Sequence, residues 1–255
     1  DRRVEGQVTA LAAEQPVRSD VDAHQQVAGR SAVDAGRTLA LDPDGLPVVD
    51  AGRSGTTLDR IAVLHAAPEP YGRLLRHHLD AAGVPATFFV LGSSVAESPA
   101  LVRSEVAAGH EVGVHNWEHT DVYGVDADEL RGSVRRTVSA IEHAGAPTPT
   151  LWRPPYGRID APALMVAGEL GLDVLLWSRH APSAADAAAL AHSAHAGTVV
   201  LCHDGRSQPN AAIFQALGRS IAALKAEGLR FVTGSQLLAA DERVCASAAH
   251  AGAAV

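Results

Sequence analysis

The sequence predicts an α/β fold, a distorted (β/α) barrel of about seven parallel strands. From Arg60 onward, short apolar runs alternate with helical segments of about 10–15 residues, which is the pattern of parallel βα units. The chain has 255 residues, 47% of them hydrophobic, which is enough for one large core. His115, Arg153, His180 and His203 each follow an apolar run, where barrels of this kind place their chemistry.

The expected elements begin with a strand over 61–64, a helix over 72–82, a strand over 87–91, a helix over 98–108 and a strand over 111–114. Asp126-Ala127-Asp128-Glu129 is a capping pattern that opens the next helix, and Gly145 ends it. The apolar positions of this helix are Leu130, Val134, Val138 and Ile141. Further strands are expected over 150–152, 174–177, 198–201 and 230–232.

Changes in composition divide the chain into three parts. Residues 1–57 form an N-terminal extension, 58–240 the α/β domain, and 241–255 a flexible tail. Within the extension, Asp42-Pro43-Asp44-Gly45 is a strong turn signal between apolar segments, so a β-hairpin is expected there.

Charge and composition exclude several classes of function. The net charge of −8, without a Lys/Arg cluster, argues against binding to nucleic acid. No run approaches the roughly 20 apolar residues that cross a membrane. Cys202 and Cys245 are expected as two thiols rather than a disulfide framework. The chain begins at Asp1 rather than Met, so a cytoplasmic and a secreted location both stay open. The oligomeric state also stays open.

His115 and His119 have the spacing of a metal-binding pair. Residues four apart share one face of a helical turn, so two imidazoles can reach one ion. Because the chain contains 13 histidines, the alternative is a chance pair.

Two further motifs follow in order. Arg153-Pro154-Pro155-Tyr156-Gly157 is a rigid turn after a strand, which can position a charge and backbone N–H groups; the alternative is a surface arginine on a proline-rich turn. His203, in Leu201-Cys202-His203-Asp204, can transfer a proton near neutral pH, or else it bonds to its neighbour Asp204.

This ordered set resembles the NodB-type polysaccharide deacetylases of carbohydrate esterase family 4, over about residues 60–238. The resemblance implies the NodB-type barrel and a zinc-dependent removal of acetyl groups from sugars. It makes His115 and His119 metal ligands and His203 the general acid. Arg153 would orient a catalytic aspartate, and the Tyr156 N–H would stabilise the oxyanion. The residues expected on the substrate side are Tyr156, Pro155, Trp177, His180 and Leu201, of which Leu201 would line an acetate pocket.

The first motif departs from the family, which has an Asp-Asp pair on its first core strand. An ungapped match places Ala66 and Ala67 at the pair, and a shift by one residue places His65 at the catalytic base and Ala66 at the metal ligand. In either register the carboxylate ligand is lost, so we expect a weakly bound divalent metal, zinc or another, or none. The fourth motif is also changed, to Arg179-His180-Ala181-Pro182-Ser183.

The sequence therefore predicts a hydrolase-type or divergent enzyme that acts on an acetylated, amide-bearing or glycosylated small molecule. His203, Arg153 and His65 are the candidate catalytic residues. Two alternatives stay open: a non-catalytic relative that binds carbohydrate or protein, and a metal-free lyase or cyclase on the same scaffold.

Overall fold

The computed structural model describes residues 40–41, 47–48, 60–67, 72–203 and 211–240, and for 40–41, 47–48, 60–67 and 72–74 it describes the backbone alone. In the N-terminal extension, β1 (Ala40–Leu41) pairs antiparallel with β2 (Pro47–Val48), at the position of the expected hairpin. The turn between them and the tail beyond residue 240 lie outside the described residues. The boundaries of the three parts remain predictions.

Eight strands in the described part of the chain form one sheet in which every pairing is parallel. They are β3 (Arg60–Ala67), β4 (Thr87–Val90), β5 (Glu111–Val114), β6 (Leu151–Trp152), β7 (Asp173–Val174), β8 (Arg179–His180), β9 (Val199–His203) and β10 (Arg230–Val232). Their order is β7-β6-β5-β4-β3-β9-β8, with β10 beside β3. The predicted parallel α/β fold is confirmed.

The two edge strands of this sheet are neighbours in the chain, joined by residues 175–178. Leu175 N donates to Trp152 O at 3.0 Å, and Ser178 N donates to Val199 O at 3.0 Å. This segment is thus bonded to β6 and β9 and links the edge strands β7 and β8, which are not paired with each other in the described sheet. The strand expected over 174–177 is wrong beyond Val174, because these residues link the two edge strands instead of continuing β7.

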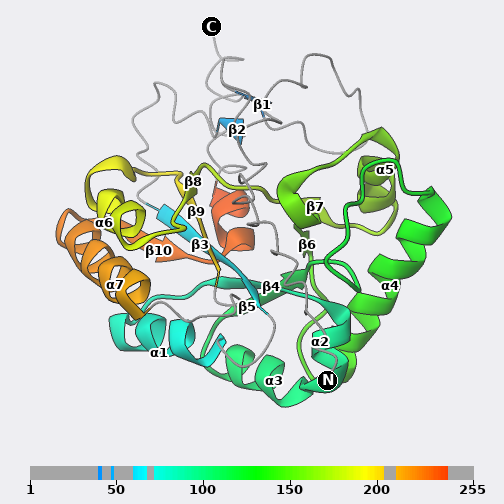
Figure 1. Ribbon diagram of the computed structural model, residues 1–255, viewed down its shortest axis with the longest axis horizontal. Coiled ribbons are helices and arrows are strands. Elements are labelled where there is room, and N and C mark those ends of the chain that lie inside the picture. Colours follow the sequence, from blue (N-terminus) through cyan, green and yellow to red (C-terminus); the bar gives the residue numbers. More distant parts are fainter. Residues whose placement is uncertain (1–39, 42–46, 49–59, 68–71, 204–210, 241–255) are drawn as a thin grey trace, which may run out of the picture.

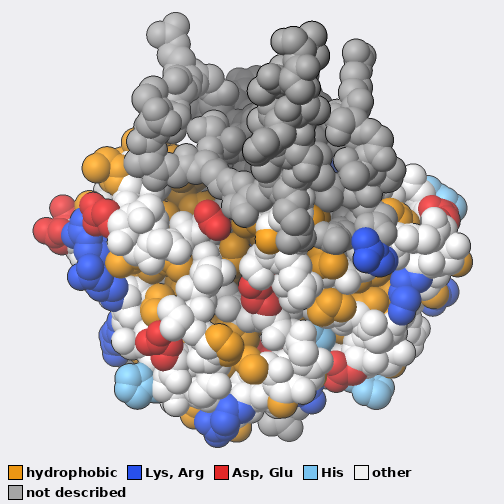
Figure 2. Space-filling model, turned by 180° about the vertical axis from the view of Figure 1, so that it is seen from behind, with side chains coloured by type: hydrophobic (Ala, Val, Ile, Leu, Met, Phe, Trp, Pro, Cys, Tyr) orange, Lys and Arg blue, Asp and Glu red, His pale blue; other side chains and the backbone are white. Residues whose placement is uncertain are grey.

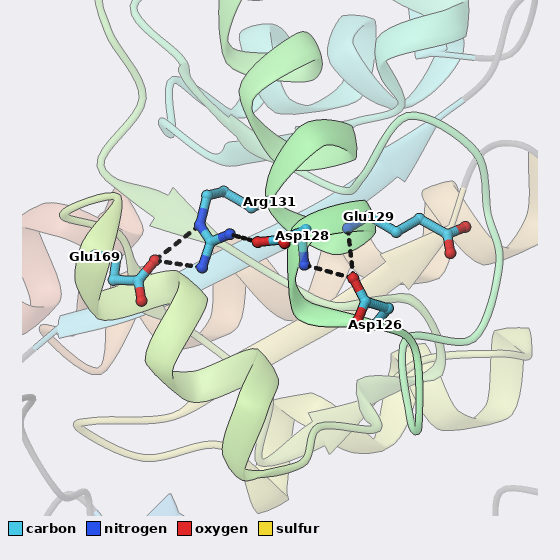
Figure 3. Close-up of polar contacts among 5 residues, drawn as sticks. All are labelled: Asp126, Asp128, Glu129, Arg131 and Glu169. Atoms are coloured by element: carbon cyan, nitrogen blue, oxygen red, sulfur yellow. Dashed lines mark hydrogen bonds and ion pairs between the residues drawn. The ribbon is translucent and has the colours of Figure 1, made fainter.

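Helices surround the curved sheet (Figure 1). They are α1 (Gly72–Ala82), α2 (Gly92–Glu97), α3 (Pro99–Ala107), α4 (Ala127–His143), α5 (Ala161–Glu169), α6 (Ala184–Ser193) and α7 (Ala211–Ala226). The predicted capping pattern of α4 is confirmed, since the Asp126 side chain accepts hydrogen bonds from the backbone N–H groups of Asp128 and Glu129 (Figure 3).

Alternation along the strands separates two apolar cores. Phe88, Trp152 and Cys202 belong to the larger cluster, which the strands share with the helices. Phe89, Leu151, Leu175, Val199 and Leu237 form a smaller cluster on the opposite, inner face of the sheet. A residue's position in a strand therefore decides whether it faces the helices or the inside of the barrel.

Acidic and basic side chains are interspersed over the face shown in Figure 2. Of the helices that the structure describes, none combines the length and apolar character needed to cross a membrane.

Candidate functional site

The carboxyl ends of β5, β6, β8 and β9 bring the predicted histidines and arginine together. His115 follows the last residue of β5, and Arg153 follows the last residue of β6. Because Val114 and Trp152 face the helices, the next residue along each chain turns to the inner face. His203, the last residue of β9, has the same alternation as Val199 of the inner cluster.

His115 is buried and its ring orientation is fixed. Its backbone N–H donates to Val90 O at 3.0 Å, and its Nδ1–H donates to the carbonyl of Arg153 at 2.5 Å. This bond leaves Nε2 as the nitrogen that can bind a metal or accept a proton. Burial, and next the charge of Arg153, lower the pKa of His115 well below its ordinary value.

His119 lies beside His115, with 5.0 Å between the ring centroids. The Tyr156 ring packs edge-on against His119 at 4.6 Å, and the Tyr156 hydroxyl donates to the His119 carbonyl at 3.5 Å. Partial burial of the ring, with a smaller contribution from the charge of Arg153, lowers the pKa of His119. Both imidazoles are thus held in the neutral form that coordinates metals.

Arg153 is a buried cation, 1% exposed. Its backbone N–H donates to Val114 O at 3.0 Å, and its guanidinium lies 4.8 Å over the Phe89 ring. Within the described part of the chain, its Nη1 atom has no hydrogen-bond partner. Burial lowers the pKa of Arg153 to about 9, and the Cys202 thiol opposes this shift weakly.

The turn after Arg153 holds Tyr156 in a strained conformation. Pro155–Gly157 form a 3₁₀ turn in which Tyr156 has φ of 60° and Gly157 has φ of 68°. Trp177 packs against Gly157, where an added Cβ would come within 2.6 Å of its ring. Pro155 is buried and Tyr156 is 61% exposed, so the turn presents Tyr156 on a rigid support.

His180 and His203 form a second imidazole pair at the ends of β8 and β9. His180 Nε2 lies 3.3 Å from His203 Nδ1, and the ring centroids are 5.1 Å apart. The charge of His203 is the smallest of the contributions that lower the pKa of His115. Leu201 shares the inner-face alternation of His203 and is buried.

The register of β3 shows where the first motif, which differs from the family pattern, lies in the sheet. Ala66 is opposite His203 on β9 and Phe89 on β4, so it occupies the strand position level with the site. His65 is opposite Cys202 and Phe88, which belong to the helix-facing cluster. The side chains of β3 are outside the described residues, so the role of His65 as base stays a prediction.

The residues fit a resident metal only in part. His115 and His119 offer two neutral imidazoles, but the described residues contain no group of three or more His, Cys, Asp or Glu side chains able to hold an ion. A catalytic zinc normally has three protein ligands. Among the residues that the structure describes, the donor set thus falls short by one ligand.

Asn116 has a structural role that sequence reasoning missed. Its Oδ1 accepts a hydrogen bond from Trp152 Nε1 at 2.8 Å, and its φ is 68°. Asn116 and Tyr156 are the non-glycine residues with positive φ in the described chain, and each belongs to a site motif. The available signal was Asn itself, which tolerates this conformation better than most residues.

The fold and the site together define a parallel β/α-barrel protein with an imidazole-rich site at the carboxyl ends of its strands. A family model described as polysaccharide deacetylase matches residues 66–175. Over 161 residues the chain is 32% identical to a peptidoglycan-N-acetylglucosamine deacetylase of Bacillus cereus, which covers 60% of this chain and 75% of that protein. The chain belongs to the polysaccharide deacetylase family.

Longer relatives and solved structures agree with this assignment. The chain is 32% identical over 191 residues to the Listeria monocytogenes peptidoglycan-N-acetylglucosamine deacetylase PgdA, covering 72% of this chain but 38% of that protein. It therefore spans about two fifths of the length of that relative. A family 4 carbohydrate esterase from Streptomyces lividans in complex with acetate superposes with a TM-score of 0.60 at 29% identity, covering 68% of this chain and 90% of that one.

Proposed function

We propose that the chain is a deacetylase-type hydrolase that acts on an acetylated, amide-bearing carbohydrate. The carrying observation is the His203–His180 pair, 3.3 Å apart, which lies with His115 at the carboxyl ends of the strands. The names of the peptidoglycan deacetylase relatives support an N-acetylated sugar as the substrate class.

In the proposed reaction, water attacks the acetyl carbonyl, the C–N bond breaks, and acetate and a protonated amine are released. His203 Nε2 takes one proton from the attacking water and returns it to the leaving nitrogen, because Nδ1 faces His180, and the second proton of the water passes to the released amine. The rigid turn would place the Tyr156 N–H near the oxygen that gains negative charge.

The test is acetate release from N-acetylglucosamine oligosaccharides by the purified protein, with and without added divalent metal. His203→Ala should lower the rate about 100-fold or more. The matched control is His192→Ala, an exposed histidine near the end of α6, which should leave the rate unchanged. If wild type releases no acetate under either condition, the hydrolase proposal fails.

The donor set supports a weak metal site. We expect the protein, purified without added metal, to hold less than one equivalent of zinc by elemental analysis, because a third ligand is missing among the described residues. His115→Ala should remove what zinc remains. Tightly held, stoichiometric zinc would contradict this expectation and point to a ligand outside the described residues.

The alanines at positions 66 and 67 favour a second candidate, a non-catalytic carbohydrate-binding protein, because they remove the acidic groups of the family's chemistry. In calorimetry this candidate gives saturable binding of the oligosaccharide without turnover. The hydrolase gives acetate release that depends on His203.

A further inference from the structure

We propose that Arg153 forms a binding site for a small carboxylate, which takes the place of the acidic side chain that the chain lacks at Ala66 and Ala67. This site is distinct from any metal-bound position, since its donor is the guanidinium. The inference concerns the same region as the proposed hydrolase but does not require turnover.

The unpartnered nitrogen of Arg153 carries the inference. Arg153 is 1% exposed, and among the described residues its Nη1 has no hydrogen-bond partner. A buried charge without a counterion costs several kcal/mol in proteins, so such groups are normally paired. An anion from solution would supply the missing pair.

The described side chains around Arg153 do not supply the partner. No ion pair with Arg153 occurs among the described side chains. The imidazole of His115 is a polar neighbour, but it is bonded to the backbone carbonyl of Arg153. At the strand position level with His203, the chain has Ala66. Arg153 is therefore a cation without an acidic partner among the described side chains.

Shape and burial select the chemical class of the anion. The Phe89 ring lies 4.8 Å from the guanidinium carbon and covers one face of the group, and the N–H donors point outward along its edge. A planar carboxylate accepts two parallel N–H bonds in that plane. Burial restricts the ligand to a small carboxylate, or to a carboxylate that projects from a sugar.

The experiment measures binding by the full chain in EDTA, at constant ionic strength kept with chloride. Thermal stability is recorded against acetate and formate, and then against glucuronate with glucose as its uncharged control. We expect a saturable rise in Tm with carboxylate and none with added chloride. A rise with acetate points to a free anion, and a rise confined to glucuronate points to a substrate carboxylate.

Variants of the arginine decide the assignment. Arg153→Met should abolish the rise, and Arg153→Lys, which keeps the charge but loses the two-pronged geometry, should weaken the affinity at least tenfold. Arg135→Met, an exposed arginine on α4, is the matched control and should bind as wild type does. If Arg153→Met fails to fold, Arg153→Lys provides the test.

Two results would overturn the site: a carboxylate effect no larger than that of chloride, or an equal effect in wild type and Arg153→Lys. Because binding is measured without substrate turnover, failure of the hydrolase proposal would leave this result standing. Conversely, acetate release without carboxylate binding would remove this site and keep the hydrolase.

Discussion

At the scale of the residue, the site combines strained backbone with buried polar groups. Asn116 and Tyr156 both adopt positive φ. Asn116 directly follows His115, and Tyr156 lies three residues after Arg153, so each is close to a predicted functional side chain. Conformations of this kind cost free energy and persist where the surroundings hold them. For Asn116 the support is visible, because its side chain is bonded to the buried Trp152 indole.

Replacement of Asn116 by alanine should lower the free energy of unfolding by about 2–3 kcal/mol, because Trp152 Nε1 loses its acceptor and alanine disfavours positive φ. Urea denaturation measures the loss. Asn116→Gly, which tolerates the φ but also lacks the acceptor, should lose less. Equal losses in the two variants would show that the backbone conformation carries no cost.

Acid should destabilise the metal-free protein through His115. Its pKa in the folded state is lowered, so the unfolded chain binds a proton first as pH falls below about 6.5. The stability that His115 contributes is present above this pH and is lost toward the lower folded-state pKa, at up to about 1.4 kcal/mol per pH unit. In EDTA, His115→Gln should show a shallower loss of stability between pH 6.5 and 5, and identical slopes would contradict the assignment.

At the scale of the element, α4 shows which features of a helix follow from its local sequence. Its start at Asp126 and its buried positions Leu130, Val134 and Ile141 follow from capping and periodicity. The tertiary link is Arg131, which bonds to Asp128 in its own helix and to Glu169 at the end of α5, at 2.8 Å (Figure 3). Because these charges are exposed, the link adds little stability.

The N-cap of α4 should matter more than this ion pair. Asp126→Ala should lower the free energy of unfolding by about 1 kcal/mol, since two backbone N–H groups of the first turn lose their acceptor. Asp126→Asn keeps an accepting oxygen and should stay within a few tenths of wild type in the same thermal or urea measurement. A loss in Asp126→Asn equal to that in Asp126→Ala would assign the effect to charge.

At the scale of the whole molecule, a polar network joins the segment after β10 to the amino ends of β4 and β5. Thr87 Oγ1 accepts from Gly234 N and donates to Glu111, both at 2.7 Å, and Ser235 N donates to Glu111 at 3.1 Å. These contacts place Leu237 in the inner core with Phe89 and Leu151. The network thus holds the segment after β10 against the sheet at the end opposite the site.

A methyl group at Gly234 should disrupt the packing of this segment against the inner core. An added Cβ would lie 2.6 Å from Leu175 and 2.7 Å from Leu151, so Gly234→Ala should cost about 1–3 kcal/mol by overpacking. Gly132→Ala on α4, where nothing lies within 4 Å, should instead stabilise by up to about 1 kcal/mol. Thermal unfolding of the two variants compares the sites, and a stable Gly234→Ala protein would show that the inner core yields to the methyl.

The sequence by itself determined the parallel α/β class, the ends of α4 and the order of the site motifs. These features depend on neighbouring residues, through periodicity, capping and apolar runs that end at His115, Arg153 and His203. The membership in the polysaccharide deacetylase family, predicted from those motifs, is confirmed. The loss of the Asp pair at positions 66 and 67 was also visible in the residues alone.

Only the tertiary structure decided how these residues act on one another. Residues 174–177 resemble a strand in sequence, yet from Leu175 onward the chain links β7 to β8, because Leu175 and Ser178 donate hydrogen bonds to Trp152 on β6 and Val199 on β9. The pairing of His180 with His203 joins strands whose distance in the chain gives no local signal. The Nη1 atom of Arg153 has no hydrogen-bond partner among the described residues. This too depends on every group packed around the side chain, since burial and charge compensation are properties of the folded molecule.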